Sequence, residues 1–173
     1  MHETEDKRIT DISMNKRTIV PLSELDLPGL LALNNAHAKE TSWLDEIQLN
    51  ALMQKACYAR GVKPAEAFLL AFDPSAKYDN RNFHWFRERY KNFIYIDRIV
   101  VASTSRRQGL AGALYADLIE WAAQREYDFV GCEVNKVPPN LSSDVFHERM
   151  GFTQVGEGHL SADKQVGYLV RHI

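Results

Sequence analysis

The sequence predicts an α/β domain in which helices pack against a mixed β-sheet, and three observations support this class. Apolar runs with the composition of strands alternate with segments of helical period along most of the chain. The clearest pair joins a β-branched and aromatic run at residues 93–102 to a helical stripe that begins near Gly109. The 173 residues are 45% hydrophobic and 25% charged, as expected for one globular domain. We therefore predict a single domain over residues 17–173.

The N-terminal elements follow from short apolar runs and helix caps. Residues 1–16 are charged and aperiodic, which predicts a flexible tail. Residues 17–22 are a short strand candidate. Asp26 and Asp45 are each placed to cap a following helix, and the apolar spacing alone would carry the second helix to Arg60.

Downstream of the central helix, the pattern returns to strands. Residues 129–134 predict a buried strand that only Glu133 interrupts. Two prolines then lead into a helix at residues 140–149, which Gly151 would end as a C-cap. The last two predicted strands form an antiparallel hairpin and comprise residues 152–155 and 165–171.

The polar turn STSRRQG, at residues 103–109, connects the strong strand to the central helix and predicts an anion site. The first N–H groups of a helix have no intrahelical acceptor, and the helix dipole places partial positive charge there. Gly109 allows a close approach of the backbone, and Arg106 and Arg107 add full positive charges.

Two segments of the chain resemble motifs of the GNAT family of acyl-CoA N-acyltransferases. Arg106-x-x-Gly109-x-Ala111 resembles the family's pyrophosphate loop, Q/R-x-x-G-x-G/A, and a hydrophobic residue, Val101, stands five positions before the arginine as in the family. Residues 140–152 resemble the downstream segment N-x-x-A-x-x-L/F-Y-E-K-x-G-F and depart from it mainly at Ser143 and His147.

The resemblance implies the GNAT fold, a central, mixed, mostly antiparallel twisted sheet of about six to seven strands flanked by about four to five helices. It places a hairpin near residues 56–62 and 67–72, which we favour over the longer second helix. It implies acetyl-CoA as cosubstrate, with pantetheine in a splay between the two central strands. The implied cofactor-binding residues are Ile99, Val100, Val101, Arg106, Arg107, Gln108, Gly109, Leu110, Ala111, Gly112, Asn140 and Phe146.

Two carboxylates inside apolar strands are candidates for the base that deprotonates the acceptor amine. Burial raises a carboxyl pKa toward the value that a base at neutral pH requires. Glu133 is the first choice, because the resembling ribosomal-protein N-acetyltransferases place a glutamate directly before the strand's valine, as in Glu133-Val134. Asp97 is the second choice, and its side chain would share a face with Ile99 unless a bulge intervenes. Either carboxylate could instead pair with a cation such as Arg98.

His147 is the departure with a chemical consequence. The family has a tyrosine there, whose hydroxyl lies near the CoA sulfur and can protonate the departing thiolate. An imidazole, with a reference pKa of about 6.5, would lose its proton earlier on the alkaline side. We predict His147 as the acid; the alternative is a packing or hydrogen-bonding role.

Residues 73–90 match the family least and concentrate aromatic side chains with charged ones. One interpretation is a short helix that patches the sheet edge. The other is a lid over the acceptor site, since substrate-closing segments are typically such loops. The acceptor-binding candidates are Asp79, Phe83, Trp85 and Tyr90.

Composition and charge narrow the possible cofactors, partners and locations of the protein. A net charge of −2 does not favour a nucleic-acid-binding surface. Cys57 and Cys132 lack metal-ligand spacing, so we expect reduced thiols and no metal. The absence of a signal-like or membrane-length apolar run favours a cytoplasmic protein without a membrane partner. An edge strand near the C-terminus would allow a homodimer.

The predicted function is acetyl transfer from acetyl-CoA to a primary amine by direct attack in a ternary complex. The acceptor would be a small molecule or a protein N-terminus. A second hypothesis is a non-catalytic acyl-CoA-binding regulatory module. A nucleotide-binding P-loop protein would need a G-x-x-x-x-G-K-S/T run, which the chain lacks.

Overall fold

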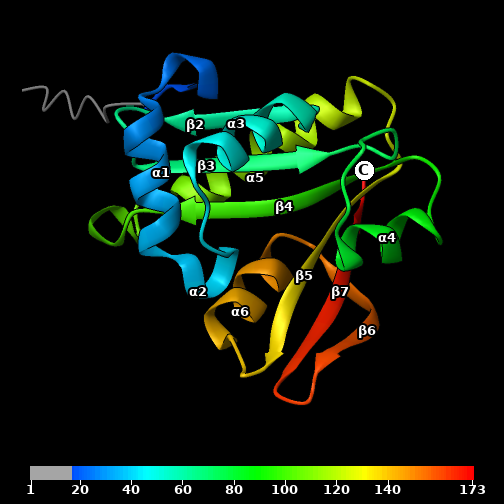
Figure 1. Ribbon diagram of the computed structural model, residues 1–173. Helices are drawn as coiled ribbons and strands as arrows, with labels where there is room; N and C mark the ends of the chain where they lie inside the picture. Colours follow the sequence, from blue (N-terminus) through cyan, green and yellow to red (C-terminus); the bar gives the residue numbers. More distant parts are fainter. Residues whose placement is uncertain (1–16) are drawn as a thin grey trace, which may run out of the picture.

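A seven-stranded sheet with the order β1-β2-β3-β4-β5-β7-β6 forms the centre of the computed structural model, which describes residues 17–173 (Figure 1). All neighbouring strands are antiparallel except β4 and β5, which are parallel. This sheet confirms the predicted fold class; the predicted tail, residues 1–16, lies outside the described residues. The strands are β1 (Ile19–Pro21), β2 (Tyr58–Val62), β3 (Ala67–Phe72), β4 (Phe93–Val101), β5 (Phe129–Val137), β6 (Thr153–Ser161) and β7 (Lys164–His172).

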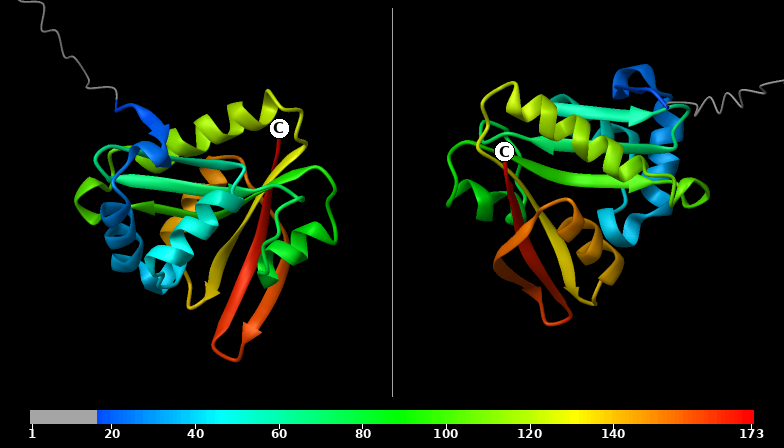
Figure 2. Two further views of the ribbon diagram at one scale, coloured as in Figure 1. Left: turned by 45° about the horizontal axis from the view of Figure 1, so that its top comes forward. Right: turned by 180° about the vertical axis from the view of Figure 1, so that it is seen from behind.

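Helices cover both faces of the sheet, and each face has its own hydrophobic core. Side chains of α1, α3 and α4 pack on one face, while α5 lies across the other, as the rear view in Figure 2 shows, and α6 adds Phe146 and Met150 to the core under α5. The helices are α1 (Leu27–Ala36), α2 (Ala38–Thr41), α3 (Glu46–Lys55), α4 (Arg81–Arg87), α5 (Leu110–Ala123) and α6 (Leu141–Arg149). None of these helices is long and apolar enough to cross a membrane.

The predicted caps are present where the sequence placed them. The Asp26 carboxylate accepts a hydrogen bond from the Gly29 N–H at 2.9 Å, and Asp45 forms a capping box with Gln48. The helix that follows Asp45 ends at Lys55 instead of continuing to Arg60, because β2 pairs with both β1 and β3. The hairpin that we favoured is therefore confirmed.

The two C-terminal strands are each longer than predicted. β6 extends through Gly156 and Gly158, residues that disfavour a strand when only propensity is considered. A Cβ atom at Gly156 would lie 2.4 Å from the Trp85 ring, and one at Gly158 would lie 2.4 Å from the Tyr168 hydroxyl. The glycines therefore let two large rings lie against the strand, and β6 forms the sheet edge predicted near the C-terminus.

A β-bulge in β4 decides which way its charged residues point. Arg98 pairs with Leu70 and Ile96 with Ala71, so Asp97 is the extra residue. Before the bulge, Tyr95 faces the core under α1, α3 and α4. After the bulge, Val100 faces this same core, whereas Ile99 faces the core under α5. Asp97 thus does not share the face of Ile99.

β4 and β5 pair over only three residues each and then separate. The pairing joins residues 93–95 to residues 129–131, after which β5 continues beside β7 alone. Figure 1 shows the two strands diverging toward their C-terminal ends. The β5 side of β4 beyond Tyr95 is therefore a strand edge with no strand beside it.

Candidate active site

Two adjoining cavities open where β4 and β5 separate, with volumes of about 210 Å³ and 630 Å³. Both are lined by Ile99 of β4 and Asn135 of β5, and by Asn140, Ser143 and His147 from the α6 segment. Glu133 lines the smaller cavity, whereas Arg106 and Phe146 line the larger one. The two cavities thus share one wall, and a carboxylate lines the smaller one while an arginine lines the larger one.

The start of α5 forms the mouth of the larger cavity. Gly109 occupies the N-cap with φ of 76°, a left-handed conformation that favours glycine. The first backbone bond into the helix runs from the Ala113 N–H to the Gly109 carbonyl, so the N–H groups of residues 110–112 have no acceptor within it. Val101, Arg106 and Ala111 line the cavity beside them. This arrangement suits a diphosphate followed by an extended arm along the β4 edge.

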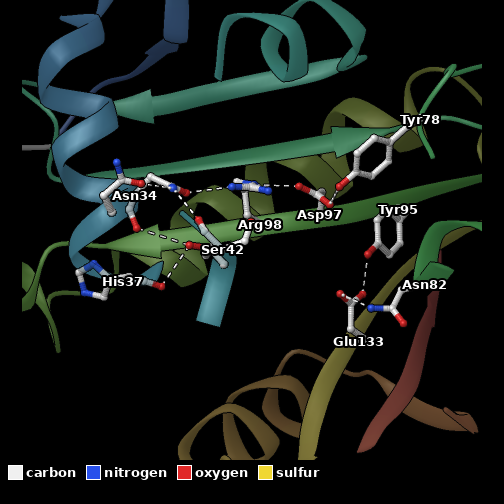
Figure 3. A network of polar contacts seen from close by, with 11 residues as sticks. Asn34, His37, Ser42, Tyr78, Asn82, Tyr95, Asp97, Arg98 and Glu133 are labelled. Carbon is white, nitrogen blue, oxygen red and sulfur yellow. Dashed lines mark hydrogen bonds and ion pairs between the residues drawn. The ribbon is translucent and has the colours of Figure 1, made fainter. Parts of the chain in front are cut away.

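Glu133 is held by two neutral hydrogen-bond donors. The Tyr95 hydroxyl donates to Oε2 at 2.7 Å, and the Asn82 amide donates to Oε1 at 3.0 Å (Figure 3). Burial raises the pKa of Glu133 from 4.5 to about 7, although the hydrogen bond from Tyr95 opposes this shift. No cation pairs with this carboxylate among the described residues, so Glu133 can gain and lose a proton near neutral pH.

Asp97 belongs to a buried ion pair. Arg98 Nε donates to Asp97 Oδ2 at 2.8 Å, and both side chains are about 5% exposed or less. The Tyr78 hydroxyl donates to the other oxygen of Asp97 at 2.6 Å, and Arg98 Nη1 donates to Asn34 Oδ1 of α1 at 2.9 Å. Figure 3 shows this network running beside β4 toward Ser42, whose carbonyl accepts from Asn34. Asp97 is therefore occupied by a fixed cation, which makes it a weaker candidate for the base than Glu133.

His147 is buried at 5% exposure and both of its ring nitrogens are engaged. Nδ1 lies 2.8 Å from the Ser143 carbonyl, which only accepts, so Nδ1 carries the hydrogen. Nε2 lies 2.8 Å from the Tyr115 hydroxyl, which donates to it when the imidazole is neutral. Burial lowers the pKa of His147 and therefore favours the neutral form.

A third cavity of about 240 Å³ reaches Glu133 from the segments around α2 and α4. Residues of α2, among them Glu40 and Thr41, line it together with Asn82, Asp97 and Lys164. Glu133 thus borders two cavities: the smaller cavity of the gap between β4 and β5, and this third cavity, which is lined mostly by polar side chains. A molecule in the third cavity and a molecule in the gap would therefore both contact the Glu133 carboxylate.

The predicted acceptor-binding residues are not brought together in the gap. Phe83 is fully buried, and Tyr90 packs near Phe86 and Phe129. Asp79 and Trp85 line a separate hollow of about 660 Å³ between α4 and β6, which shares no lining residue with the cavities that contain Glu133. Residues 81–87 form a helix packed on the sheet, as the first of the two interpretations of this segment predicted.

The other predicted residues are distributed around the start of α5 and the gap between β4 and β5. Asn140 caps α6, accepting from the Ser143 N–H at 3.3 Å, and also lines both cavities of the gap. Arg107 and Gln108 are exposed beside Gly109, and a Cβ at Gly112 would meet open space. Leu110 is instead buried under α5, so only its backbone N–H is offered to a ligand. The residues missed by sequence reasoning are Asn82, Tyr95 and Tyr115, whose contacts with Glu133 and His147 span 32 to 51 positions.

A mixed sheet that splays at its centre beside a glycine-started helix is the arrangement expected of an acyl-CoA-dependent transferase. The family model described as the acetyltransferase (GNAT) family matches residues 51–152. The chain therefore belongs to the GNAT family. No curated protein sequence matches the chain.

Solved structures share the fold at low sequence identity. The ribosomal-protein-S18-alanine N-acetyltransferase from Escherichia coli aligns with a TM-score of 0.66 and 16% identity, over 91% of this chain and 94% of that one. Ard1 from Thermoplasma volcanium aligns with a TM-score of 0.68 and 14% identity, over 90% and 97%. An aminoglycoside 6'-N-acetyltransferase complexed with coenzyme A aligns with a TM-score of 0.65 and 15% identity, over 84% and 89%. At these identities the likeness concerns the fold alone.

Among residues 17–173, no group of three or more His, Cys, Asp or Glu side chains is arranged to hold a metal ion. The two cysteines in this part of the chain are free thiols, and burial raises the pKa of Cys57 to about 12. Burial also raises the pKa of Cys132 well above its usual value, so both thiols stay protonated near neutral pH and are poor nucleophiles.

Proposed function

We propose that this protein transfers the acetyl group of acetyl-CoA to a primary amine by direct attack within a ternary complex. The observation that carries the proposal is the position of Glu133, a buried carboxylate with a pKa of about 7. It lies across the gap from the edge of β4 that has no strand beside it, and this edge leads to the start of α5, where an anion could bind. A base, a strand edge for an extended cofactor arm and a diphosphate site would then border two adjoining cavities. The coenzyme A in one of the similar structures supports the same assignment.

Each step of the reaction has a candidate group in this chain. When bound, acetyl-CoA supplies an activated acetyl group. The N–H groups at the start of α5 and the guanidinium of Arg106 bind the diphosphate. The edge of β4 from Ile99 to Val101 orients the pantetheine arm, and a backbone N–H at Ile99 or Val100 polarises the thioester carbonyl. Glu133 accepts the proton of the attacking ammonium.

The amine would approach Glu133 through the polar cavity beside α2 and α4. The charged side chains that border this cavity are three carboxylates and three cations: Glu40, Asp97, Glu133, Lys39, Arg98 and Lys164. Most of the lining is therefore polar, and a polar amine could reach Glu133 through it. Enzymes of the same fold are named for a protein alanine acceptor and for aminoglycosides. A small amine and a protein N-terminus therefore both remain acceptor classes to test.

The hydrogen bonds of His147 favour a different source of the thiolate's proton from the one that the sequence suggests. A neutral His147 has no proton to spare, because its single N–H is donated to Ser143. Burial raises the pKa of the Tyr115 phenol well above its usual value, so the phenol keeps its proton at all physiological pH values. We propose that the thiolate takes the Tyr115 hydroxyl proton as this O–H turns from His147 Nε2 to the sulfur, and that the resulting phenolate is reprotonated from water. Before this step, the hydrogen bond to His147 holds the hydroxyl in place. An early alkaline loss of rate, expected for an imidazolium acid, is then not expected.

Replacing His147 by Phe is expected to lower kcat at least tenfold while acetyl-CoA affinity is kept, because the phenol loses its acceptor. Tyr115→Phe, which keeps the imidazole, is expected to cause a similar loss. Steady-state kinetics with each variant, together with calorimetric titration of acetyl-CoA, measures both quantities. Full rate in His147→Phe would refute the role of the pair, and a loss in His147→Phe alone would assign the acid role to the imidazole.

Calorimetric titration of the wild-type protein with acetyl-CoA tests the cofactor site directly. We expect Arg106→Ala to weaken binding about tenfold, since one charge-assisted hydrogen bond to a phosphate is lost. Arg125→Ala is the matched control, because Arg125 follows the other end of the 14-residue helix α5, about 20 Å away. Absence of acetyl-CoA binding in the wild type would contradict the proposed function.

A regulatory acyl-CoA-binding module is the competing hypothesis. Such a module would bind acetyl-CoA but release no CoA with any amine. A panel of small amines and of peptides with free N-termini, followed by detection of the free thiol, separates the two. The pKa of about 7 for the buried Glu133 carboxylate favours an enzyme, because strongly perturbed pKa values cluster at catalytic sites and cofactor binding alone does not require such a group.

A further inference from the structure

The helix α4 carries a buried amide that contacts Glu133. Asn82 is 8% exposed, and its Nδ2 donates to Glu133 Oε1 at 3.0 Å. Its Oδ1 accepts from the Tyr168 hydroxyl at 3.0 Å. Since Tyr95 donates to the other oxygen of Glu133, a continuous hydrogen-bonded chain connects β7, α4, β5 and β4. The labelled part of this chain, from Asn82 through Glu133 to Tyr95, is visible in Figure 3.

Packing and capping hold α4 in one position. The Asn80 side chain accepts from the N–H groups of Asn82 and Phe83 at 2.9 Å and 3.0 Å, which starts the helix directly before the amide. Phe83 and Phe86 are fully buried on the sheet. The Asn82 side chain therefore cannot leave Glu133 without disturbing a well-packed element.

A second contact joins α4 to the C-terminal hairpin. The Trp85 ring stacks on the Tyr168 ring with centroids 4.1 Å apart and planes 15° apart. Gly156 of β6 makes room for Trp85. Tyr168 thus contacts α4 twice, by its ring through Trp85 and by its hydroxyl through Asn82.

We propose that Asn82 is a positioning residue for the base: together with Tyr168 it fixes the Glu133 carboxylate in the orientation that faces the gap between β4 and β5. This inference rests on the proposed function of Glu133. It also gives the segment between β3 and β4 a catalytic purpose different from a lid, because the segment acts from within the core on the base itself.

The chemistry of the donors fits this role. Asn82 and Tyr95 are neutral, so they orient the carboxylate and lower its pKa less than a cation at hydrogen-bond distance would. With an arginine at the position of Asn82, Glu133 would be held as an ion pair, as Asp97 is held by Arg98. The amide thus combines a fixed geometry with a pKa that stays near 7.

Several other groups around Glu133 can influence its titration. Burial is the largest cause of its raised pKa, and the Asp97 charge raises it further. The titratable and charged side chains that line the cavities beside Glu133, contact it or contact Asn82 come from six elements and one loop: Asp97, Arg98 and Tyr95 of β4, Cys132 of β5, Lys164 and Tyr168 of β7, Lys39 and Glu40 of α2, His147 of α6, Tyr115 of α5, and Tyr78 of the loop before α4.

The test replaces Asn82 by Leu, which keeps the volume and removes the hydrogen bond. We expect kcat to fall about tenfold with an unchanged KM for acetyl-CoA, and the acidic limb of the pH profile to move up by about half a pH unit. Independently of activity, 13C NMR titration of the Glu133 carboxyl should show the same upward shift. Tyr168→Phe, which keeps the stacked ring and removes the hydroxyl, should cause a smaller change in the same direction.

Phe86→Leu is the matched control, because it removes buried apolar volume from α4 while the Asn80 cap and Phe83 still hold the helix and every polar contact is kept. It should lower stability and leave the titration of Glu133 unchanged. An Asn82→Leu protein with unaltered kcat and an unaltered Glu133 titration would overturn the proposal, and so would a Phe86→Leu protein that reproduces the pH shift. If the wild type itself transfers no acetyl group, the proposed function fails, whereas the NMR titration still decides whether Asn82 controls Glu133.

Discussion

Replacing Glu133 by Gln is expected to lower kcat at least a hundredfold, the largest loss of activity that we predict for this chain. A positioned general base contributes about 10²- to 10⁴-fold to a rate, and an amide has no comparable affinity for a proton. Glutamine keeps the shape of the side chain and can still accept from the Tyr95 hydroxyl. Steady-state kinetics with a responsive amine measures the loss, and calorimetry with acetyl-CoA checks that the cofactor still binds.

The pH dependence of the wild type follows from the same residue. Glu133 acts as a base only when it is ionised, and burial raises its pKa to about 7. The rate should therefore increase as the pH rises through about 7, and the residual activity of Glu133→Gln should lack this limb. An Asp97→Asn variant that lost the limb while Glu133→Gln kept it would move the base to Asp97.

The stability of Glu133→Gln against unfolding shows whether a loss of activity comes from a loss of folded protein. The folded-state pKa of Glu133 lies above its usual value of 4.5, so the folded protein binds more protons than the unfolded chain between about pH 4.5 and pH 7. The contribution of this group to stability is present below that window and is lost as the pH rises through it. Glu133→Gln carries no charge to bury, and we expect it to be at least as stable as the wild type at pH 8 in urea unfolding.

Local signals in the sequence were sufficient for much of the fold, including the helix starts that border the larger cavity. Asp26, Asp45 and Asn140 cap helices because the capping contact lies within three residues of the cap. The helix start at Gly109 was likewise evident from a change of hydrophobic period. Features of this kind depend on neighbours along the chain, which the sequence displays directly.

The surroundings of Glu133 depend on contacts that no local pattern contains. Asn82 meets Glu133 across 51 positions and Tyr168 across 86 positions. The bulge at Asp97 turns that side chain away from the face of Ile99, and a single sequence gives no sign of an extra residue in a strand. The aromatic residues 83–86 were recognised as a cluster, but only the tertiary structure shows that Phe83 and Phe86 are buried and that Trp85 packs against β6.

The same network that orients Asp97 should dominate the stability of the central strand. We expect Arg98→Met to lower the free energy of unfolding by about 3–5 kcal/mol, because a buried carboxylate loses its cation. The Asn34 side-chain oxygen loses its donor at the same time. Urea unfolding followed by circular dichroism measures the change, provided that the slope of free energy against urea stays the same.

A second ion pair, which is more exposed, provides the comparison. Arg60 contacts Asp117 at 2.9 Å, a distance similar to that of Arg98 and Asp97, but the side chains are 36% and 29% exposed. Arg60→Met should therefore cost about 1 kcal/mol or less. If the two variants lose the same stability, burial is not what makes the Arg98 pair matter.

Removing both charges of the Asp97–Arg98 pair separates the cost of burying a charge from the attraction between the two charges. In Asp97→Asn/Arg98→Met no buried charge is left alone, so we expect the double variant to regain part of the stability lost by Arg98→Met. Tyr78 can still donate to the amide oxygen that replaces the carboxylate oxygen. Since Glu133 keeps its own donors, Tyr95 and Asn82, the double variant should also keep a rate that rises with pH. Loss of that pH dependence would show that the ion pair and the base act as one unit, against the separation of roles that their hydrogen bonds indicate.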